Sequence, residues 1–337
     1  MSLSQTLKLL LTQEANWRRQ TINLNASENY TSPLVKQLIG LHPSYDFYTF
    51  PPSGGSIDGP WHFTQPPYLQ KIEAHINQLG KILLDCNILD PRPKGGQASE
   101  IAVLTGLAKA GDKVLYVQEQ DGGHFGLNFI SQKIGIQLIP IPFDGENYQI
   151  DVEKTQQLIL KIWKKETPRK IILIGQSFVL RQQPLDKLVE KAKNQFPDLI
   201  VAYDVSHILG LIIGKQFTNP ISQGVDFIHG STHKTFPGPQ KGILGFPVHF
   251  DNNLRLTIQQ ALAPGLQSNC GTSEILGLAV ALEEMQIHGI AYARAVCQHA
   301  QYLAQLLDKA GFHIAGKHFG FTETHQVWII ISTEQRA

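Results

Sequence analysis

Residues 230–239 of the 337-residue chain read Gly-Ser-Thr-His-Lys-Thr-Phe-Pro-Gly-Pro, which places Lys234 between a hydroxyl-rich run and a turn of proline and glycine. The segment just before it, 225–228, predicts a short buried strand. A lysine at a strand end, in a loop of small and polar residues, is held in place. Held against apolar walls, such a lysine can lose its proton and attack a carbonyl carbon to form a Schiff base. Taken alone, the same pattern also fits a surface lysine in a turn.

A second strand signal lies about thirty residues earlier. Residues 199–204 read Leu-Ile-Val-Ala-Tyr-Asp, an apolar run that ends in Asp204 and continues into Val-Ser-His at 205–207. A buried run that ends in an aspartate and leads to a Schiff-base lysine suggests pyridoxal phosphate. The aspartate keeps the pyridine nitrogen protonated, so that the ring accepts electrons. Asp204 and Lys234 are therefore the first candidates for a cofactor site.

The composition is that of a globular chain with a large core, since 42% of the residues are hydrophobic and 17% are charged. A formal net charge of +1 gives no basic excess that would favour a nucleic-acid or membrane partner. The three scattered cysteines, Cys86, Cys270 and Cys297, predict a reducing, cytoplasmic compartment without disulfides, and no pair has metal-ligand spacing. Residues 3–20 predict an amphipathic first helix whose apolar part is too short for a membrane span.

Strand and helix signals alternate through the middle of the chain. Strands are predicted at 113–117, 137–142, 170–175, 199–204 and 242–247, and helices at 68–84, 101–110, 151–165, 184–194, 273–285 and 292–310. This alternation predicts a mostly parallel sheet with helices on both faces. Ligands bind at the carboxyl ends of such strands, where Ser177, Asp204, His207 and Lys234 are all expected to lie.

These motifs resemble serine hydroxymethyltransferases. Five segments match that family in order, from about residue 22 to the end of the chain: 25–33 (Asn-Ala-Ser-Glu-Asn-Tyr-Thr-Ser-Pro), 121–124 (Asp-Gly-Gly-His), 204–207, 231–239, and 264–267 leading to the apolar run 278–282. The resemblance implies an α/β fold, the large domain of fold-type I pyridoxal phosphate transferases, with a mostly parallel seven-stranded sheet between helices. It also implies that the strand at 242–247 runs antiparallel.

The implied division of the chain has three parts. An N-terminal helical arm spans 1–25, the cofactor-binding large domain spans 26–288, and 289–337 begin a small, incomplete C-terminal α/β domain. Residues 311–314 and 327–331 read as the first strands of that small domain.

The resemblance assigns catalytic roles to four residues. Lys234 holds the cofactor covalently, Asp204 supports the pyridinium, His124 stacks on the ring, and His207 orients a cofactor oxygen. Ser177 would bond the phenolic oxygen, and Arg181 falls on a matching arginine of the family. The implied binding residues for the cofactor are Gly95, Gly96, Gln97, His124, Ser177, Asp204, His207, Ser231, His233 and Lys234, and the substrate-binding candidate is Ser27.

Gly95, Gly96 and Gln97 come just before a predicted helix. A helix N-terminus offers free N–H groups and the positive end of the dipole to an anion, although ordinary capping would give the same pattern. The resemblance places the cofactor phosphate here. The family usually carries serines at this position, and Gln97 can donate through its amide instead.

Two departures from the family concern the reaction. The family's Tyr-x-Glu-Gly-Tyr-Pro-Gly segment, whose glutamate handles protons in folate-linked chemistry, is replaced by residues 45–55. When the chain is aligned with the family, either Thr49 or Tyr45 falls at the position of that glutamate. Neither is a carboxylate, and Asp46 and Asp58 are the nearby carboxylates that could substitute. The family's C-terminal arginine, which grips the substrate carboxylate, has no counterpart before Ala337, and we therefore expect a fragment, a completing partner or another way of holding the substrate.

Three functions therefore remain open. The first is a pyridoxal phosphate enzyme that makes or breaks the Cα–Cβ bond of a small amino acid, as in serine, glycine and one-carbon metabolism. The second is a folate-independent aldolase, transaldolase or other pyridoxal enzyme, which the missing glutamate favours and which makes tetrahydrofolate a doubtful cofactor. The third is a non-catalytic relative that binds the cofactor or a partner through the retained fold, which the missing arginine favours. The resemblance also implies a homodimer with shared sites, to which 45–55 and 267–271 would contribute.

Overall fold

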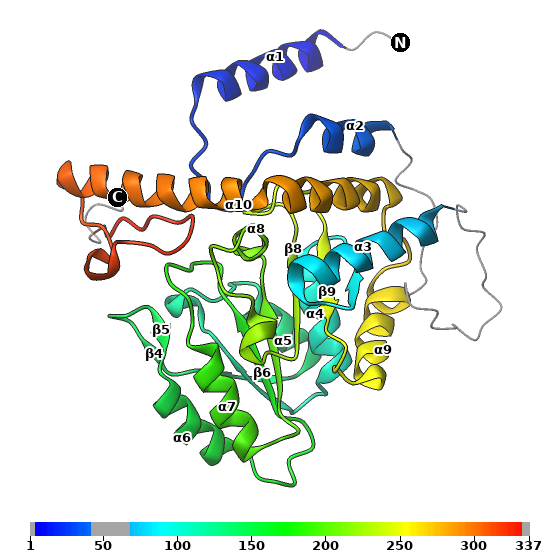
Figure 1. The fold of residues 1–337 in the computed structure, drawn as a ribbon, viewed down its shortest axis with the longest axis vertical. Coiled ribbons are helices and arrows are strands. Elements are labelled where there is room, and N and C mark those ends of the chain that lie inside the picture. The colour runs from blue at the N-terminus through cyan, green and yellow to red at the C-terminus, as the bar shows by residue number, and fades with distance from the viewer. Residues whose placement is uncertain (1–3, 42–67, 332–337) are drawn as a thin grey trace.

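A seven-stranded sheet forms the centre of the computed structural model, which describes residues 4–41 and 68–331 (Figure 1). The strand order is β1-β9-β8-β7-β6-β2-β3. The bounds are β1 (Ile88–Asp90), β2 (Lys113–Tyr116), β3 (Gln137–Pro140), β6 (Ile171–Gly175), β7 (Ile200–Asp204), β8 (Phe227–Ser231) and β9 (Gly242–Phe246). Neighbours pair in parallel from β3 to β8, whereas β9 runs antiparallel to β8 and to β1. The predicted fold class and the predicted antiparallel strand are confirmed.

Strand β6 is apolar along its whole length because both faces of the sheet are covered. Strand β6 reads Ile-Ile-Leu-Ile-Gly, and all five residues are buried. Its side chains alternate between two cores, with Ile172 and Ile174 in one and Ile171 and Leu173 in the other. Helices on each face complete these two cores.

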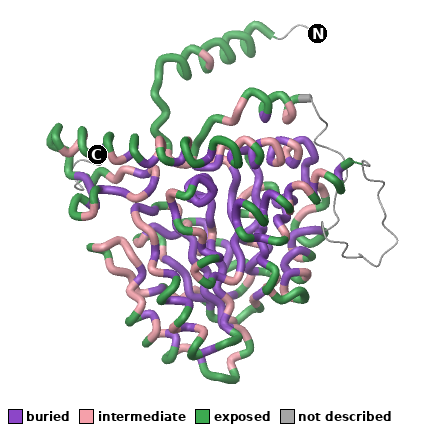
Figure 2. Tube along the Cα trace, in the orientation of Figure 1, coloured by how far each residue is buried: buried purple, intermediate pink, exposed green. Residues whose placement is uncertain are grey.

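One face of the sheet is covered by α4 (Gly96–Leu107), α5 (Leu127–Ile134) and α9 (Asn252–Gln260). The other face carries α3 (Leu69–Leu84), α6 (Val152–Ile162), α7 (Leu185–Gln195), α8 (Leu209–Ile213) and the 38-residue α10 (Thr272–Lys309). Figure 2 shows the buried backbone concentrated in the sheet and in the inner sides of these helices. A short ribbon of β4 (Phe143–Asp144) and β5 (Gln149–Ile150) lies outside the main sheet.

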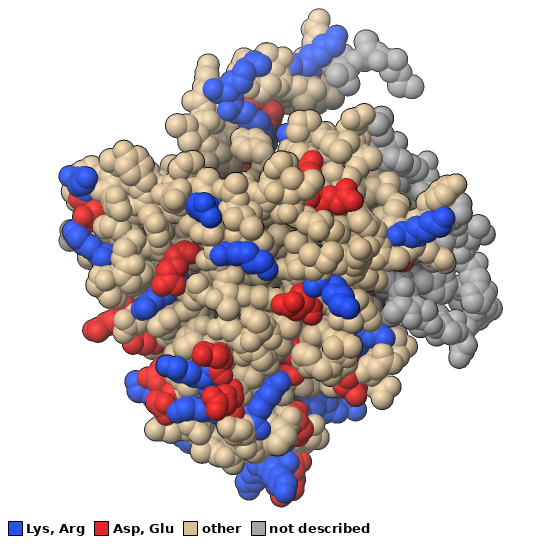
Figure 3. Space-filling view, in the orientation of Figure 1, with Lys and Arg blue, Asp and Glu red and all other residues tan. Residues whose placement is uncertain are grey.

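The two N-terminal helices differ in their packing. Helix α2 (Pro33–Leu41) contacts α10, and its Val35 is buried in the core. Helix α1 (Gln5–Gln20) stands away from the body of the molecule and has no buried residue (Figures 1 and 2). Acidic and basic side chains are interspersed on the face seen in Figure 3, in keeping with a net charge close to zero. Among the helices of 4–41 and 68–331, none is long and apolar enough to cross a bilayer.

The helices predicted at 273–285 and 292–310 are one continuous helix, so the predicted break is wrong. Met285, Gly289, Ala293 and Cys297 are buried at intervals of four residues, and they carry one packed face of α10 through the expected gap. A Cβ atom on Gly289 would lie 3.2 Å from Cε of Met285. The glycine therefore allows close packing in the helix and does not end it.

The strands predicted at 311–314 and 327–331 reduce to one antiparallel bridge between Ile314 and Ile329. Ile314 and Phe321 pack with Ala304 of α10 in a small separate core. The backbone is left-handed at Gly316, Gly320 and Phe321, and it bends the chain between the two segments. Within the described residues, the two segments therefore pair only at this single bridge. The predicted boundary between 288 and 289 lies within α10, and the division into domains stays a prediction.

The short elements are predicted less accurately from the sequence than the long ones. Helix α4 begins at Gly96 and ends at Leu107, earlier at both ends than the predicted 101–110. Strand β1, which has three residues, and helices α5 and α9 are not predicted from the sequence. Short elements of this kind depend on their neighbours in space and leave little periodic signal.

Candidate active site

Residues predicted for the cofactor follow four neighbouring strands of the sheet, β8, β7, β6 and β2. Asp204 is the last residue of β7, Ser177 follows β6, Lys234 follows β8, and His124 lies in the loop after β2. Because these strands are parallel, their carboxyl ends meet at one edge of the sheet. The fold therefore brings together residues that are far apart in the sequence.

Lys234 lies at the centre of this edge, where its Nζ is 3.1 Å from Nε2 of His207. Burial lowers the pKa of Lys234 below its ordinary value, and the carboxylates of Asp204 and Glu100 oppose this shift. Burial also lowers the pKa of His207 well below its ordinary value. A lysine whose charged form is disfavoured is a better nucleophile at neutral pH.

The main chain of the lysine loop is anchored from three directions. The side-chain amide of Asn29 donates to the carbonyl oxygen of Lys234 at 2.6 Å. The hydroxyl of Tyr292, on α10, donates to the carbonyl of Thr235 at 3.0 Å. The Thr235 hydroxyl in turn donates to the carbonyl of His207 at 2.8 Å. The N-terminal segment and α10 therefore both fix the position of Lys234.

Asp204 begins a chain of hydrogen bonds that links β7 to β8. Its Oδ1 accepts from the backbone N–H of Ser206 at 2.7 Å, and Oγ of Ser206 accepts from the N–H of Ser231 at 2.8 Å. A Cβ atom on Gly230 would lie 2.8 Å from Oδ1 of Asp204 and 2.7 Å from N of Ser206. Glycine at 230 leaves the room that this contact needs.

The N-terminus of α4 faces this hydrogen-bonded chain. A Cβ atom on Gly96 would lie 3.0 Å from the backbone nitrogen of Ser231, so the helix start and the end of β8 are in close contact. Oγ of Ser231 and Nδ1 of His233 are buried, and neither has a hydrogen-bond partner among the residues that the structure describes. Gln97 is exposed on the first turn of the helix.

This arrangement suits a phosphate group. The first N–H groups of α4 have no partners within the helix and lie at the positive end of its dipole. Buried polar atoms such as Oγ of Ser231 and Nδ1 of His233 need a partner, and a phosphate supplies several acceptor oxygens. Together with Lys234 and Asp204, these donors fit pyridoxal phosphate.

Glu100 is a site residue that the sequence analysis missed. Nδ1 of His124 lies 2.9 Å from Oε2 of Glu100, whose side chain is 2% exposed. The hydrogen bond that His124 donates to Glu100 raises the pKa of His124, while burial of the ring lowers it. Glu100 follows Gly96 by four residues, and this spacing on a glycine-led helix puts a carboxylate on the same side as the helix start.

The C-terminal segment adds two further residues. The ring of His325 stacks on that of His207 with 5.8 Å between centroids, and its Nε2 donates to the carbonyl of Ala26 at 3.0 Å. Burial lowers the pKa of His325 to about 4. Gln326 contacts both His207 and Ser177. Ala26 precedes Ser27, and the nearby Asn29 bonds to the carbonyl of Lys234, so the predicted substrate-binding segment lies beside the lysine loop.

Other predicted residues have partners within the chain. Arg181 pairs with Glu323 at 3.2 Å, and its guanidinium lies over the ring of Phe319. Gln267 donates to the carbonyl of Arg92 at 2.8 Å, which ties the 267–271 segment to the residues before α4. The substitutes considered for the missing glutamate, Tyr45, Asp46, Thr49 and Asp58, lie outside the described residues. Within 4–41 and 68–331, no group of three or more acidic, histidine or cysteine side chains could hold a metal ion.

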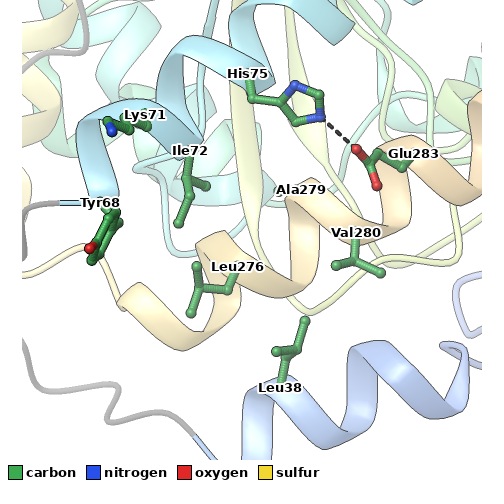
Figure 4. A pocket seen from close by; sticks show the side chains of 9 residues that line it. All are labelled: Leu38, Tyr68, Lys71, Ile72, His75, Leu276, Ala279, Val280 and Glu283. Atoms are coloured by element: carbon green, nitrogen blue, oxygen red, sulfur yellow. Dashed lines mark hydrogen bonds and ion pairs between the residues drawn. The ribbon is translucent and has the colours of Figure 1, made fainter.

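A separate groove of about 510 Å³ lies between α2, α3 and the start of α10 (Figure 4). It is lined by Leu38, Tyr68, Lys71, Ile72, His75, Leu276, Ala279, Val280 and Glu283. The described lining is mostly apolar, and its histidine and glutamate form a surface pair at 2.7 Å. None of the residues predicted for the cofactor lines this groove, so the strand edge is the better candidate for the active site.

Comparisons with known proteins point to one family. A family model described as serine hydroxymethyltransferase matches residues 3–335. The serine hydroxymethyltransferase of Thermococcus kodakarensis is 34% identical over 319 residues, which cover 94% of this chain and 71% of that protein. That of Methanothermobacter thermautotrophicus is 33% identical over 336 residues, which cover 99% and 75%. The solved structure of L-threonine transaldolase from Pseudomonas fluorescens matches with a TM-score of 0.90 and 34% identity, over 98% of this chain and 73% of that chain.

The pair of Glu100 and His124 predicts a pH-dependent stability. Because the folded-state pKa of His124 is raised, the pair stabilises the fold below the ordinary histidine pKa and loses this contribution as pH rises through the raised value. We expect Glu100→Gln to lower the pKa of His124, measured by NMR titration. It should reduce the free energy of unfolding by about 1.5 kcal/mol near pH 6 and by less at pH 9, since hydrogen bonds to charged groups contribute about that much.

Glu283→Gln is the matched control, because Glu283 also pairs with a histidine but at the exposed surface. Surface pairs contribute roughly 0–1 kcal/mol, so this variant should leave stability and the titration of His124 nearly unchanged. An unchanged titration of His124 in Glu100→Gln would contradict the assigned pairing.

Proposed function

The chain belongs to the serine hydroxymethyltransferase family, and we propose that it is a pyridoxal phosphate-dependent transferase or aldolase that makes or breaks the Cα–Cβ bond of serine, glycine or a related β-hydroxy amino acid. The observation that carries the proposal is the lysine at the strand edge. Nζ of Lys234 contacts His207, and buried donors without partners among the described residues lie on the adjoining end of β8.

Each predicted residue has a task in this proposal. When bound, pyridoxal phosphate supplies an electron sink for negative charge developing at Cα of the amino acid. Lys234 holds the cofactor covalently, Asp204 keeps the pyridine nitrogen protonated, His124 stacks on the ring, and His207 and Ser177 direct their polar atoms to the phenolic oxygen. The phosphate is held by Gly95, Gly96, Gln97, Ser231 and His233, and Ser27 binds the substrate.

Proton transfer is where this chain departs from its family. Residues 45–55, which align with the family's glutamate segment, contain no glutamate. His124 is hydrogen-bonded to the buried carboxylate of Glu100, and this pair can hold a proton next to the reacting groups. We propose that folate-linked hydroxymethyl transfer is weak and that chemistry at Cα persists.

A folate-independent transaldolase or aldolase is the second candidate. It is favoured by the likeness to an L-threonine transaldolase over 98% of this chain. The same cofactor edge would serve both reactions, because each needs an electron sink at Cα. They differ in the group that accepts the carbon fragment, and tetrahydrofolate would take part in the first reaction and not in the second.

We also propose a cytoplasmic homodimer that acts in serine, glycine and one-carbon metabolism, with residues 45–55 and 267–271 at the shared sites. Support for the dimer comes from α1, whose Leu10 and Trp17 are 55% and 61% exposed. Further exposed apolar residues on this arm are Leu7, Leu9, Leu11, Ile22 and Leu24. An amphipathic helix that has no buried residue within the described part of the chain suits the surface of a second copy. The three cysteines are buried and unpaired, which fits a reducing compartment.

Borohydride reduction tests the covalent role of Lys234. After incubation with pyridoxal phosphate, reduction should fix the cofactor on the peptide that contains Lys234, and Lys234→Arg should remove the label. Lys241 is the control, because burial lowers the pKa of this lysine too, in its case to about 8, yet its Nζ donates to the carbonyl of Cys270. Label on Lys241, or on no lysine, would refute the assignment.

Glycine in heavy water tests the chemistry. We expect cofactor-dependent exchange of the glycine α-proton with or without tetrahydrofolate, followed by NMR. Folate-dependent serine cleavage should be slower by a factor of roughly a hundred to ten thousand than in a relative with the glutamate, because a positioned acid or base contributes about that much. Robust folate-dependent cleavage that Asp46→Asn abolishes would mean that Asp46 has taken the place of the glutamate.

Light scattering tests the dimer. The double variant Leu10→Asp with Trp17→Asp should shift the protein toward monomer, because the two residues are seven apart on one side of α1. Gln5→Asp with Thr12→Asp adds the same charges, also seven apart, on the polar side and should leave the dimer intact. A monodisperse wild-type monomer that holds the cofactor would rule out the proposed assembly.

A further inference from the structure

Gln326 is 3% exposed, and its amide group has partners on both sides. Its Oε1 accepts from the backbone N–H of Val179 at 2.9 Å and from the indole N–H of Trp328 at 3.1 Å. Its Nε2 donates to the carbonyl of Ser177 at 2.9 Å and lies 3.2 Å from Nδ1 of His207. The C-terminal segment thereby reaches the histidine that contacts the lysine.

These partners leave one orientation for the amide. A backbone N–H and an indole N–H can only donate, so the oxygen must face Val179 and Trp328. A backbone carbonyl can only accept, so the NH₂ group must face Ser177. The second proton of that NH₂ group then points at Nδ1 of His207, which has to accept it with a lone pair.

The orientation of Gln326 decides which nitrogen of His207 carries the proton. Burial keeps His207 neutral, and a neutral imidazole has one N–H and one lone pair. With the lone pair at Nδ1, the proton is at Nε2, which is 3.1 Å from Nζ of Lys234. An N–H that faces an amine at this distance needs a lone pair on the amine. A charged ammonium group has none.

We propose that Gln326 is a positioning residue for Lys234, which fixes the Nε2–H tautomer of His207 and thereby holds the Lys234 amine unprotonated in the cofactor-free protein. The catalytic meaning of this relay rests on the proposed function of Lys234. The tautomer itself is a property of the cofactor-free chain and can be measured whether or not the protein binds pyridoxal phosphate.

Two nearby carboxylates favour the protonated form of Lys234. A fixed N–H donor at His207 is therefore needed to favour the neutral amine. Asp204 at the end of β7 and Glu100 on α4 both favour a charged lysine. The titratable groups that surround His207 are Lys234, His325, His124 and His233, and each of them disfavours a charged imidazole. Burial thus keeps the histidine neutral, and Gln326 selects between its two neutral forms.

Nitrogen NMR on cofactor-free protein with labelled histidine tests the tautomer directly. We expect a pyrrole-type nitrogen at Nε2 of His207 and a pyridine-type nitrogen at Nδ1 at neutral pH, assigned by the signals that His207→Asn removes. A pyrrole-type Nδ1, or a doubly protonated ring at neutral pH, would overturn the inference.

Two substitutions test the link to the lysine. In Gln326→Glu the carboxylate has no proton to give and accepts from Nδ1, so the proton should move from Nε2 to Nδ1. In Gln326→Leu, which adds no charge, the preference for Nε2 should be lost. We expect trace acylation of Lys234 at pH 7.5, followed by mass spectrometry, to slow about tenfold in Gln326→Glu, equivalent to about 1.4 kcal/mol. The slowing should be smaller in Gln326→Leu.

Gln301→Glu is the matched control. Gln301 lies on α10, and its Nε2 donates to the carbonyl of Thr322 at 3.0 Å, so the variant makes the same chemical change in the same region without a contact to His207. It should leave the tautomer and the acylation rate unchanged. If both Gln326 variants fold and also leave them unchanged, the inference is refuted. The expected tautomer together with failed borohydride labelling would uphold the inference and count against the proposed function.

Discussion

A lysine amine can remain inside a folded protein when the groups around it satisfy its hydrogen bonds without forcing it to take a proton. Lys234 meets this condition through His207, which burial keeps neutral. This environment of Lys234 depends on several distant parts of the chain. The loop of Lys234 needs Asn29 and Tyr292 to hold its main chain, and the parallel order of β6, β7 and β8 brings Ser177, His207 and Lys234 to one edge. The sheet thus serves as a frame that sets distances between loops.

The sequence predicts this frame well and its contacts poorly. Strands β6 and β7 could be predicted because runs such as Ile-Ile-Leu-Ile-Gly are typical of strands covered on both faces. The positions of Asp204 and Lys234 could be predicted because Asp204 ends one strand run and Lys234 comes soon after another. Glu100 and Gln326 could not, because their importance comes from contacts with His124 and His207 that the fold creates between distant segments. No local pattern distinguishes a buried glutamate in a helix from a solvated one.

Likeness to both serine hydroxymethyltransferases and an L-threonine transaldolase has a simple physical reading. An electron sink at Cα serves any reaction that makes or breaks a bond there, so the strand edge by itself does not select the reaction. Selection lies with the groups that move protons and with those that recognise the carbon fragment. In this chain Glu100 places a carboxylate beside His124, and the family's usual glutamate is missing from 45–55.

Segments near both ends of the described chain lie at the candidate site. Asn29 bonds to the carbonyl of Lys234, and His325 bonds to the carbonyl of Ala26 while its ring stacks on His207. The contact between residues 26 and 325 closes a loop of nearly the whole chain, and such contacts form late in folding. During synthesis, the sheet and Lys234 leave the ribosome before the segment that carries His325 and Gln326 does. The surroundings of the reactive amine are therefore completed only after residues 325 and 326 have been synthesised.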